Sequence, residues 1–389
     1  MGKPKIRFKG YNDEWEQRKL GEVAQEFKSG NFLKADEIDI AGDYPVYGGN
    51  GLRGYTSTYN HDGEFALIGR QGALCGNMNY SVGKAYFTEH AVVVEADENN
   101  DTRFLYCMLD IMNLGQYSDQ SAQPGLAVNK LIKLENFFPQ KEEQQQIGWY
   151  FNTLDRLITL HQRKYDEMKT LKKYMLQKMF PQNGPKIPKI RFEGFTGEWE
   201  QRKLGNVLKF QNGFNGSKER YGTGTKLISV MDILNDDFIT YESIRGLADV
   251  TEEEKERFSV DFGDVLFQRS SENVEDAGRT NVYLDRKRAV FGGFVIRGKK
   301  NSDYQPEFMR YVLDTKMIRK QITTKAQGAQ HINVSQETLQ DVLFCLPSKE
   351  EQIRIGNYFR NLDNLITLHQ RKCNELKNIK KFMLQSMFV

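Results

Sequence analysis

The most regular pattern of apolar positions lies in two long segments, residues 141–180 and 349–389. In each segment, apolar or bulky residues recur at alternating steps of four and three. They are Ile147, Phe151, Leu154, Ile158, His161, Tyr165 and Met168 in the first, and Ile355, Phe359, Leu362, Ile366, His369, Cys373 and Leu376 in the second. This heptad-like spacing predicts two amphipathic helices that bury a common seam. A helix of this length is a rod of about 60 Å.

Shorter apolar runs, bounded by turn residues, predict strands between these segments. They lie at residues 44–47, 64–68, 90–94, 264–267 and 290–296. Helical periodicity follows the strands near residues 101–114 and 306–320. Short strands mixed with single helices are typical of α+β domains.

The chain also repeats itself. Residues 4–23 and 188–207 are identical at 15 of 20 positions, and residues 141–180 and 349–388 at 27 of 40. The two inserts between these repeats, residues 22–140 and 206–348, show no such likeness and have different lengths, 119 and 143 residues. Two nearly identical frames therefore hold two different inserts.

The duplication divides the chain into seven segments. They are a repeated segment (1–21), the first insert (22–140), the first long helix (141–180), a linker (181–187), a second repeated segment (188–205), the second insert (206–348) and the second long helix (349–389). Because the first helix leads from one insert to the other and the second must return, we expect the two helices to be antiparallel. The predicted fold is α+β, with two globular domains separated by two long antiparallel coiled-coil helices in a pseudo-two-fold internal repeat. We expect His161 and His369 to meet near its axis as core imidazoles rather than as a metal site or pH switch.

Composition favours a cytoplasmic protein without a membrane partner. No apolar run approaches the ~20 residues that span a bilayer, and the charged first residues lack the apolar core of a secretory signal. The four cysteines, Cys75, Cys107, Cys345 and Cys373, lie far apart. That spacing disfavours a zinc ribbon or a disulfide framework and suits a reducing compartment.

The distribution of charge is more informative than the net charge of +3. The first insert carries 8 basic and 16 acidic side chains, and the second carries 20 and 21. Residues 141–187 and 349–389 each have four more basic than acidic side chains. Non-specific nucleic-acid binders usually have a broad basic surplus. Any DNA affinity must therefore come from local patches or be shared with a basic partner.

No catalytic motif is evident. Residues 222–226 lack the spacing of a phosphate-binding loop, and the triplet Asp261–Phe262–Gly263 has no accompanying kinase element. The five histidines are scattered without metal-ligand spacing. We therefore expect a protein that is not an enzyme.

Both inserts carry loops with the residue types that read DNA. Arginine can bind guanine, and asparagine or glutamine adenine, through paired hydrogen bonds, while lysine, serine and backbone amides contact phosphates. Glycines in residues 47–55 and 69–72 allow a loop to approach bases closely. The candidate DNA-binding residues are Asn50, Arg53, Tyr55, Arg70, Gln71, Lys84 and Lys130 in the first insert, and Lys218, Arg220, Arg269, Ser270, Arg279, Gln327, Gln330 and His331 in the second.

The tandem layout resembles the specificity subunits of bacterial type I restriction–modification systems over essentially the whole chain. The resemblance is carried by EWEQRKLG at 14–21 and 198–205 and by LITLHQRK at 157–164 and 365–372. Further matching stretches are GGNGLRGY at 48–55, GRQGALCGN at 69–77, PGLAVNKLIKLENFFP at 124–139 and GAQHINVSQETLQDVLFCLP at 328–347.

The resemblance implies that each insert is a target recognition domain that reads one half of a split, asymmetric site in double-stranded DNA. The helices would fix the gap between the halves and bind two methyltransferase subunits, and two motor–nuclease subunits can join them. S-adenosylmethionine, ATP and Mg²⁺ would bind those partners, and this chain would hold no cofactor and no metal. The residues expected to pack the helix pair or contact partners are Ile147, Phe151, Leu154, Leu157, Ile158, His161, Ile355, Phe359, Leu362, Leu365, Ile366 and His369.

Two alternatives remain open. One is a modification enzyme that has lost its catalytic part, although no methyltransferase or nuclease motif is visible. The other is a non-catalytic adaptor whose two heads bind proteins, which the acidic first insert favours. The salt dependence of binding to random duplex discriminates, because phosphate contacts give a steep salt slope.

Overall fold

The computed structural model describes residues 2–118, 125–182, 186–326, 328 and 331–389. Two compact units make up the chain. The first contains Met1–Gln162 and Gln370–Val389, and the second contains Arg163–His369. These units are not the two sequence repeats, because each one combines an insert with the start of one long helix and the end of the other.

The first unit is built on one six-stranded sheet. Neighbouring strands are antiparallel except for β3 and β6, which run parallel. In sheet order the strands are β2 (Ala24–Ser29), β7 (Ala91–Ala96), β5 (His61–Gly69), β6 (Met78–Phe87), β3 (Tyr44–Gly48) and β4 (Gly51–Thr56). The predicted strands 44–47, 64–68 and 90–94 correspond to β3, β5 and β7.

Two helices and a short strand pair complete the first insert. Helix α1 (Thr102–Ile111) begins at Asp101, whose carboxylate accepts a hydrogen bond of 2.9 Å from the amide of Phe104 and so caps the helix. Helix α2 (Val128–Leu131) precedes β8 (Glu135–Phe138), and β8 pairs with β1 (Glu16–Lys19) of the repeated segment. The repeated segment is therefore tied to the end of the insert that follows it.

The second unit contains two four-stranded sheets. One has the order β10 (Leu208–Asn212), β18 (Val295–Lys300), β14 (Val265–Gln268) and β16 (Thr280–Val282), and the other β12 (Gly246–Ala248), β11 (Tyr221–Ile228), β17 (Ala289–Phe291) and β13 (Ser259–Val260). Two strand pairs join β15 (Ser270–Ser271) to β19 (Ile332–Asn333), and β9 (Glu200–Lys203) to β20 (Leu343–Leu346). The helices of this insert are α4 (Val230–Ile233), α5 (Glu252–Arg257), α6 (Pro306–Leu313), α7 (Lys316–Lys325) and α8 (Gln336–Gln340).

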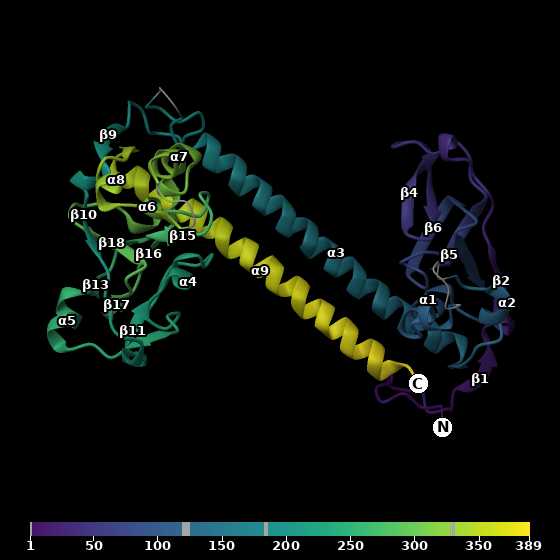
Figure 1. Ribbon diagram of the computed structural model, residues 1–389. Helices are drawn as coiled ribbons and strands as arrows, with labels where there is room; N and C mark the ends of the chain where they lie inside the picture. Colours follow the sequence, from purple (N-terminus) through teal and green to yellow (C-terminus); the bar gives the residue numbers. More distant parts are fainter. Residues whose placement is uncertain (1, 119–124, 183–185, 327, 329–330) are drawn as a thin grey trace. The chain divides into compact units, whose positions relative to one another are not determined.

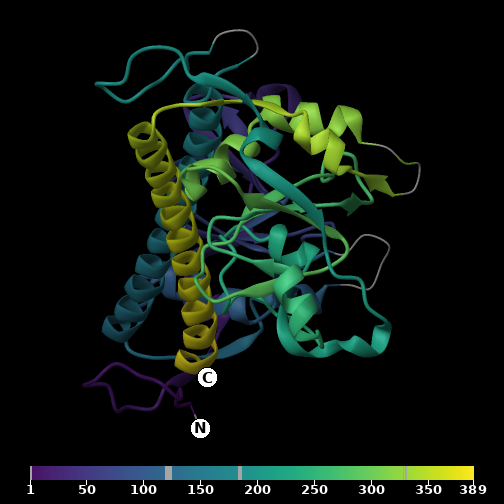
Figure 2. The same cartoon turned by 90° about the vertical axis from the view of Figure 1, so that its left-hand side faces the viewer.

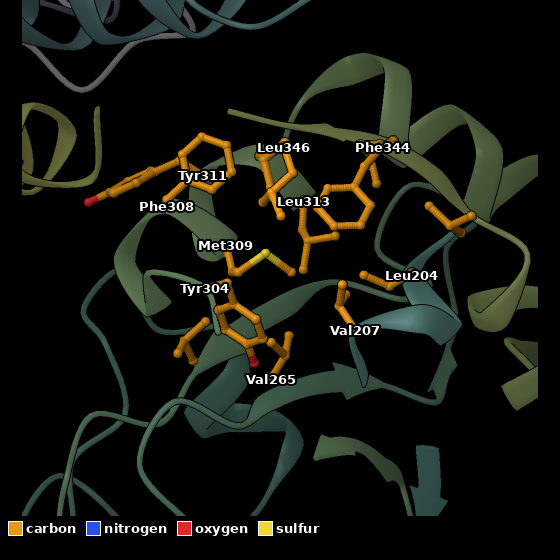
Figure 3. Close-up of a cluster of buried hydrophobic side chains, with 14 of the residues drawn as sticks. Leu204, Val207, Val265, Tyr304, Phe308, Met309, Tyr311, Leu313, Phe344 and Leu346 are labelled. Atoms are coloured by element: carbon orange, nitrogen blue, oxygen red, sulfur yellow. The ribbon is translucent and has the colours of Figure 1, made fainter. Parts of the chain in front are cut away.

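The core of the second unit lies where α6 and β20 meet the first of these sheets. Figure 3 shows Phe308, Met309 and Leu313 of α6 close to Val265 of β14 and Phe344 of β20. Leu204 and Val207, which belong to or follow the repeated segment, enter the same cluster. Repeated and inserted residues therefore share one core.

The two inserts have the same central sheet, although their sequences show no likeness. The order β2-β7-β5-β6 in the first matches the order β10-β18-β14-β16 in the second, and every pair in both is antiparallel. A helix follows the second strand of each sheet, α1 after β7 and α6 after β18. The duplication therefore extends through the inserts at the level of the fold.

Two predicted elements are interrupted. The predicted helix at 306–320 is α6 followed by α7, because Asp314 and Thr315 end the first and cap the second. The predicted strand at 290–296 is divided into β17 and β18 by a turn that starts at Gly292, whose carbonyl accepts a hydrogen bond of 2.9 Å from the amide of Val295.

The long helices α3 (Lys141–Lys178) and α9 (Lys349–Met387) pair antiparallel within each unit (Figures 1 and 2). In the first unit Lys380 donates to Asp155 at 2.6 Å, and the Cys373 thiol lies 3.5 Å from the Gln162 side-chain oxygen. In the second unit Lys172 forms an ion pair of 2.5 Å with Asp363. The two Asp–Lys pairs occupy equivalent repeat positions, so the predicted antiparallel pairing is confirmed.

The residues after each long helix pack into the core of the unit in which that helix ends. Phe388 packs on Trp15, Phe104 and Phe151, and Phe180 packs on the equivalent Trp199, Phe308 and Phe359. The amide of Ile6 donates to the carbonyl of Ser386, and that of Ile190 to the carbonyl of Lys178, both at 2.9 Å. The helical residues stop at 178 and 387 because the following side chains turn into these aromatic clusters.

Among the described residues, no helix is long and apolar enough to cross a membrane.

Candidate nucleic-acid and partner interfaces

Several predicted DNA-binding residues of the first insert gather around one surface pocket. The pocket has a volume of about 490 Å³ and is lined by Gly49, Asn50, Arg53, Gln71, Gly72, His90 and Gly125. Asn50 lies in the tight turn between β3 and β4, and Gln71 follows β5, so two separate hairpin loops bring their amide groups to one place. The lining offers arginine, asparagine, glutamine and histidine side chains, which are the donors and acceptors that contact base edges.

His90 is a pocket residue that the sequence interpretation missed. Its ring nitrogen Nδ1 lies 3.2 Å from the side-chain oxygen of Gln71, which fixes the two side chains against each other. The only sequence signal was its position directly before the apolar run of β7. That position places it at the same edge of the sheet as the residue after β5.

Arg70 follows β5 at the rim of this pocket. Its amide donates to the carbonyl of His90 and its carbonyl accepts from Leu126, both at 2.9 Å. Its guanidinium Nη1 lies 3.5 Å from the carbonyl oxygen of Glu89. The main chain is therefore held on both sides, while the guanidinium forms no ion pair with any residue that the structure describes.

In the second insert Arg269 and Ser270 lie at the end of β14, and His331 lies further along the adjoining strand pair. Ser270 pairs with Asn333 in the strand pair β15–β19, and His331 directly precedes β19. Arg269 and His331 are exposed. Gln327 and Gln330 lie outside the described residues, so their place near this cluster stays a prediction.

Other predicted residues lie away from these clusters. Lys84 pairs with Asp62 at the end of the β5–β6 hairpin opposite to Arg70, where its ammonium lies 4.6 Å from the centre of the Tyr59 ring and its pKa is raised by that contact. Tyr55 pairs with Pro45, away from the turn of the β3–β4 hairpin. Lys130 is exposed on α2, Lys218 is exposed before β11, and Arg279 forms an ion pair of 3.1 Å with Asp276.

Arg220 forms an ion pair within the second insert. Its guanidinium donates to both carboxylate oxygens of Glu254, at 3.0 and 2.5 Å, and to the carbonyl of Asp249. The hydrogen bond from Arg220 lowers the pKa of Glu254 to about 2. Because these contacts occupy its donors, we leave Arg220 out of the candidate interface.

The seam residues of the long helices divide into two groups. Ile147, Phe151 and Leu154 are buried, as are their repeat equivalents Ile355, Phe359 and Leu362. Ile158, His161, Ile366 and His369 are half-buried. Among residues 155–178 of α3, all of which the structure describes, none is buried. The buried seam residues of α3 therefore lie in its first half.

His161 lies in the first unit and His369 in the second. Their expected meeting therefore stays a prediction.

Each unit presents an exposed apolar patch on the helix pair, which we call the helix patch. In the first unit it consists of Leu157 and Leu160 on α3 with Ile379 and Phe382 on α9, exposed by 38, 50, 44 and 58%. In the second unit it consists of the equivalent Leu365 and Leu368 with Leu171 and Tyr174, exposed by 41, 48, 37 and 49%.

The members of a patch share one side of the helix pair. Leu157 and Leu160 follow the seam residue Leu154 at steps of three, as Ile379 and Phe382 follow Leu376. In an antiparallel pair, the same offset from the seam brings side chains to the same side. Leu157 and Leu365, predicted as packing or partner residues, thus belong to exposed patches rather than to the seam.

The described residues include no group of three or more His, Cys, Asp and Glu side chains that could hold a metal ion. The four cysteines are free thiols. Burial raises the pKa of Cys107, so this thiol is held in its protonated form.

The chain thus combines a duplicated frame with two different loop clusters and two equivalent helix patches. The chain belongs to the family of the type I restriction modification DNA specificity domain, which it matches over residues 12–170 and 196–378.

Among its relatives, the EcoprrI specificity subunit of Escherichia coli is 43% identical over 156 residues, which are 39% of each chain. A putative type I restriction enzyme specificity subunit of Haemophilus influenzae is 28% identical over 155 residues, 39% of this chain and 40% of the relative. The matches thus span about two fifths of these relatives' length. The fold is similar to that of the type I restriction–modification S subunit from M. genitalium, with a TM-score of 0.69, 16% identity, and coverage of 100% and 99% of the two chains.

Proposed function

We propose that this chain is the sequence-reading subunit of a type I restriction–modification complex, and that each insert reads one half of a bipartite, asymmetric DNA target. The observation that carries the proposal is that two inserts with the same central sheet present different side chains at the same sheet edge. At equivalent positions the first offers Gln71 and His90, and the second offers Ser270 and Phe294. Different side chains on one scaffold suit two different half-sites.

The helix patches supply the argument for partners. A solvent-exposed cluster of four large apolar side chains on a helix pair is a protein-docking surface by its chemistry. Because one equivalent patch lies in each unit, the chain offers two copies of the same surface. We propose that each patch binds helices of one methyltransferase subunit, so that two copies assemble on one chain. Two motor–nuclease subunits would complete the restriction complex.

In this proposal the chain itself is not catalytic. S-adenosylmethionine would bind the methyltransferase subunits, and ATP and Mg²⁺ the motor–nuclease subunits. The acidic balance of the first insert is compatible with DNA binding if the partners contribute the basic part of the DNA channel. Weak DNA binding by the chain alone, strengthened by its methyltransferase partner, is the expected consequence.

The test of the DNA proposal is methylome sequencing of a methylation-free bacterial host that expresses this chain with its neighbouring methyltransferase subunit. The expected result is a split, asymmetric motif methylated on adenine in each half. A stable complex that methylates no motif would instead favour the alternative of a two-headed protein-binding adaptor.

The patches have a separate test. Leu157→Asp/Leu160→Asp should reduce the number of bound methyltransferase copies from two to one, measured by native mass spectrometry, because only one patch is altered. Trp149→Asn is a matched control, since Trp149 is 64% exposed on the same helix but its repeat equivalent is Asn357. Two bound copies in the double variant would exclude the patch as the docking surface.

A further inference from the structure

The two inserts share an arginine at an equivalent place, directly after a central strand, half-buried in the first insert and exposed in the second. The register aligns them: Gly69 pairs with Ala91 between β5 and β7, and Gln268 pairs with Val295 between β14 and β18. Arg70 and Arg269 are the next residues after Gly69 and Gln268. They are therefore equivalent positions of the common sheet, in two segments whose sequences show no likeness.

The contacts of the two arginines are also the same. The amide of Arg269 donates to the carbonyl of Phe294 and its carbonyl accepts from Val334, both at 2.9 Å, as Arg70 does with His90 and Leu126. The guanidinium Nη1 of Arg269 lies 3.3 Å from the carbonyl oxygen of Gly293, as that of Arg70 lies 3.5 Å from Glu89. Each contact is with a main-chain group, so it does not depend on the neighbouring side chain.

A pair of glycines supports the same geometry. The amides of Gly30 and Gly213 donate to the carbonyls of Ala91 and Val295, at 3.0 and 3.2 Å. A Cβ at either glycine would meet a backbone oxygen, Phe87 O at 2.3 Å or Gly292 O at 2.1 Å. Both inserts therefore have a glycine directly after the edge strand, β2 or β10, where a side chain would clash with the loop that precedes β7 or β18.

Both arginines are available to bind an anionic ligand. Neither forms an ion pair with a described residue, whereas Arg103 in the first insert pairs with Glu64 at 2.6 Å and Arg220 in the second with Glu254 at 2.5 Å. In an insert with 8 basic and 16 acidic side chains, an arginine without an acidic partner is notable. Its main chain is fixed, so binding through its remaining donors orders only the side chain.

The side chains around the arginines differ. Gln71 stands where the second insert has Ser270, and His90 where it has Phe294, which is 69% exposed. Residues that read different bases differ between the two heads, whereas a residue that both heads share is suited to chemistry common to every target. In duplex DNA that chemistry is the phosphate backbone.

Resting on the proposed function, we infer that Arg70 and Arg269 are equivalent phosphate-binding residues, each of which positions its domain on the backbone beside its half-site, while the variable neighbours read the bases. Each guanidinium binds a backbone phosphate through a charge-assisted hydrogen bond. The two heads are thereby placed on DNA in the same way, whatever sequence each one reads.

The experiment measures DNA binding of the chain in complex with its methyltransferase subunits, by fluorescence anisotropy over a range of salt concentrations. The duplexes carry the complete target, the target with either half scrambled, or a random sequence. Arg70→Ala and Arg269→Ala should each weaken binding to all four duplexes by a similar factor of about ten, and each should lower the salt slope by about one. The methylated motif should stay the same. Arg286→Ala is the charge-matched control and should change affinity less than twofold. Arg286 is exposed and follows β16, beyond the end of that strand that lies away from Arg269.

Three outcomes would overturn the inference. A changed base in one half of the methylated motif would show that the arginine reads a base, and an effect no larger than that of Arg286→Ala would show that it contacts no DNA. Loss of binding with Arg70→Lys, in a complex that melts as the wild type does, would also contradict it, because lysine still binds a phosphate as a point charge. If Arg70→Ala fails to fold, Arg70→Lys and Arg70→Gln test the same point. They should retain and lose the salt-slope contribution, respectively. A wild-type complex that binds no duplex would refute the proposed function itself, before any variant is compared.

Discussion

Phe388→Ala should destabilise the first unit and leave the second nearly unchanged. Phe388 is 8% exposed, and its ring centre lies 5.3, 6.0 and 6.3 Å from those of Phe104, Phe151 and Trp15. Truncating a buried phenylalanine to alanine typically costs about 3–5 kcal/mol. Because Phe388 follows the end of α9 and the site can relax there, we expect about 3 kcal/mol.

The assay is hydrogen exchange of backbone amides, compared between the two units. A loss of about 3 kcal/mol corresponds to roughly hundredfold faster exchange for amides that open with the first unit, such as those of β5 and β7. For a unit of this size it also corresponds to a Tm lower by about 6–12 °C. Phe180→Ala is the mirror experiment and should accelerate exchange in the second unit, since Phe180 is 1% exposed among Trp199, Phe308 and Phe359.

Phe382→Ala provides the control on the same helix. Phe382 is 58% exposed, so its truncation should change stability by no more than about 0.5 kcal/mol, while weakening methyltransferase binding at the helix patch. The reasoning would be refuted if Phe388→Ala accelerated exchange equally in both units. It would also be refuted if Phe388→Ala and Phe382→Ala had the same effect on the first unit.

Three further predictions concern ion pairs. Glu143→Gln and Glu351→Gln should each lower the free energy of unfolding of their own unit by about 3 kcal/mol, measured in urea. The reason is that each carboxylate is 1% exposed and binds two N–H groups of Arg7 or Arg191. A loss of less than about 1 kcal/mol of stability would contradict this. Asp155→Lys should lower the free energy of unfolding by only about 0.5–1 kcal/mol, because its ion pair with Lys380 is partly exposed. Adding Lys380→Asp should restore most of this stability. A double variant no more stable than the single one would argue against the helix register. By NMR, the carboxyl of Glu254 should titrate near pH 2. Its ion pair with Arg220 should therefore contribute fully to stability above the ordinary pKa of 4.5, and this contribution should be lost as pH falls through 2. Arg220→Ala should return the pKa of Glu254 toward 4.5.

The long helices could be predicted from the sequence because their seam recurs without interruption over many turns. Strands β3, β5, β7 and β14 could be predicted because each is a compact apolar run. Strand β6 was not predicted, because Gly83 and Lys84 break the alternation of apolar and polar residues that begins at Met78. The breaks at Asp314–Thr315 and Gly292–Gly293 were missed because the apolar pattern continues across them.

The candidate DNA-binding residues were chosen by chemical type, and the structure separates them by position. Asn50, Arg53 and Gln71 line one pocket, whereas Lys84 lies at the other end of the β5–β6 hairpin. Arg220 shows the limit of choosing by type, since nothing in its local sequence reveals that Glu254, distant along the chain, occupies its donors. The equivalence of Arg70 and Arg269 was likewise invisible, because it depends on strand register rather than on similar neighbours.

The contacts between frame and insert explain why unlike inserts sit in the same frame. The repeated Gln144 accepts from the amide of Asp101 at 3.0 Å and donates to the carbonyl of Pro139 at 2.9 Å. Gln352 makes the same contacts with the amide of Gln305 and the carbonyl of Pro347, both at 2.9 Å.

The neighbouring repeated glycines act in the same way. A Cβ at Gly148 would lie 3.1 Å from the amide nitrogen of Phe104, and one at Gly356 3.1 Å from that of Phe308, so each glycine lets the first turn of α1 or α6 approach the long helix. In both repeats these contacts are with the main chain of the insert, which every sequence possesses, and the side chains of Phe104 and Phe308 add equivalent aromatic contacts with the frame. The side chains that follow β5 and β14 take no part in these contacts, so they can differ without disturbing the contact between the insert and the long helix. That separation of attachment from recognition is what a subunit needs if its two heads are to read different DNA.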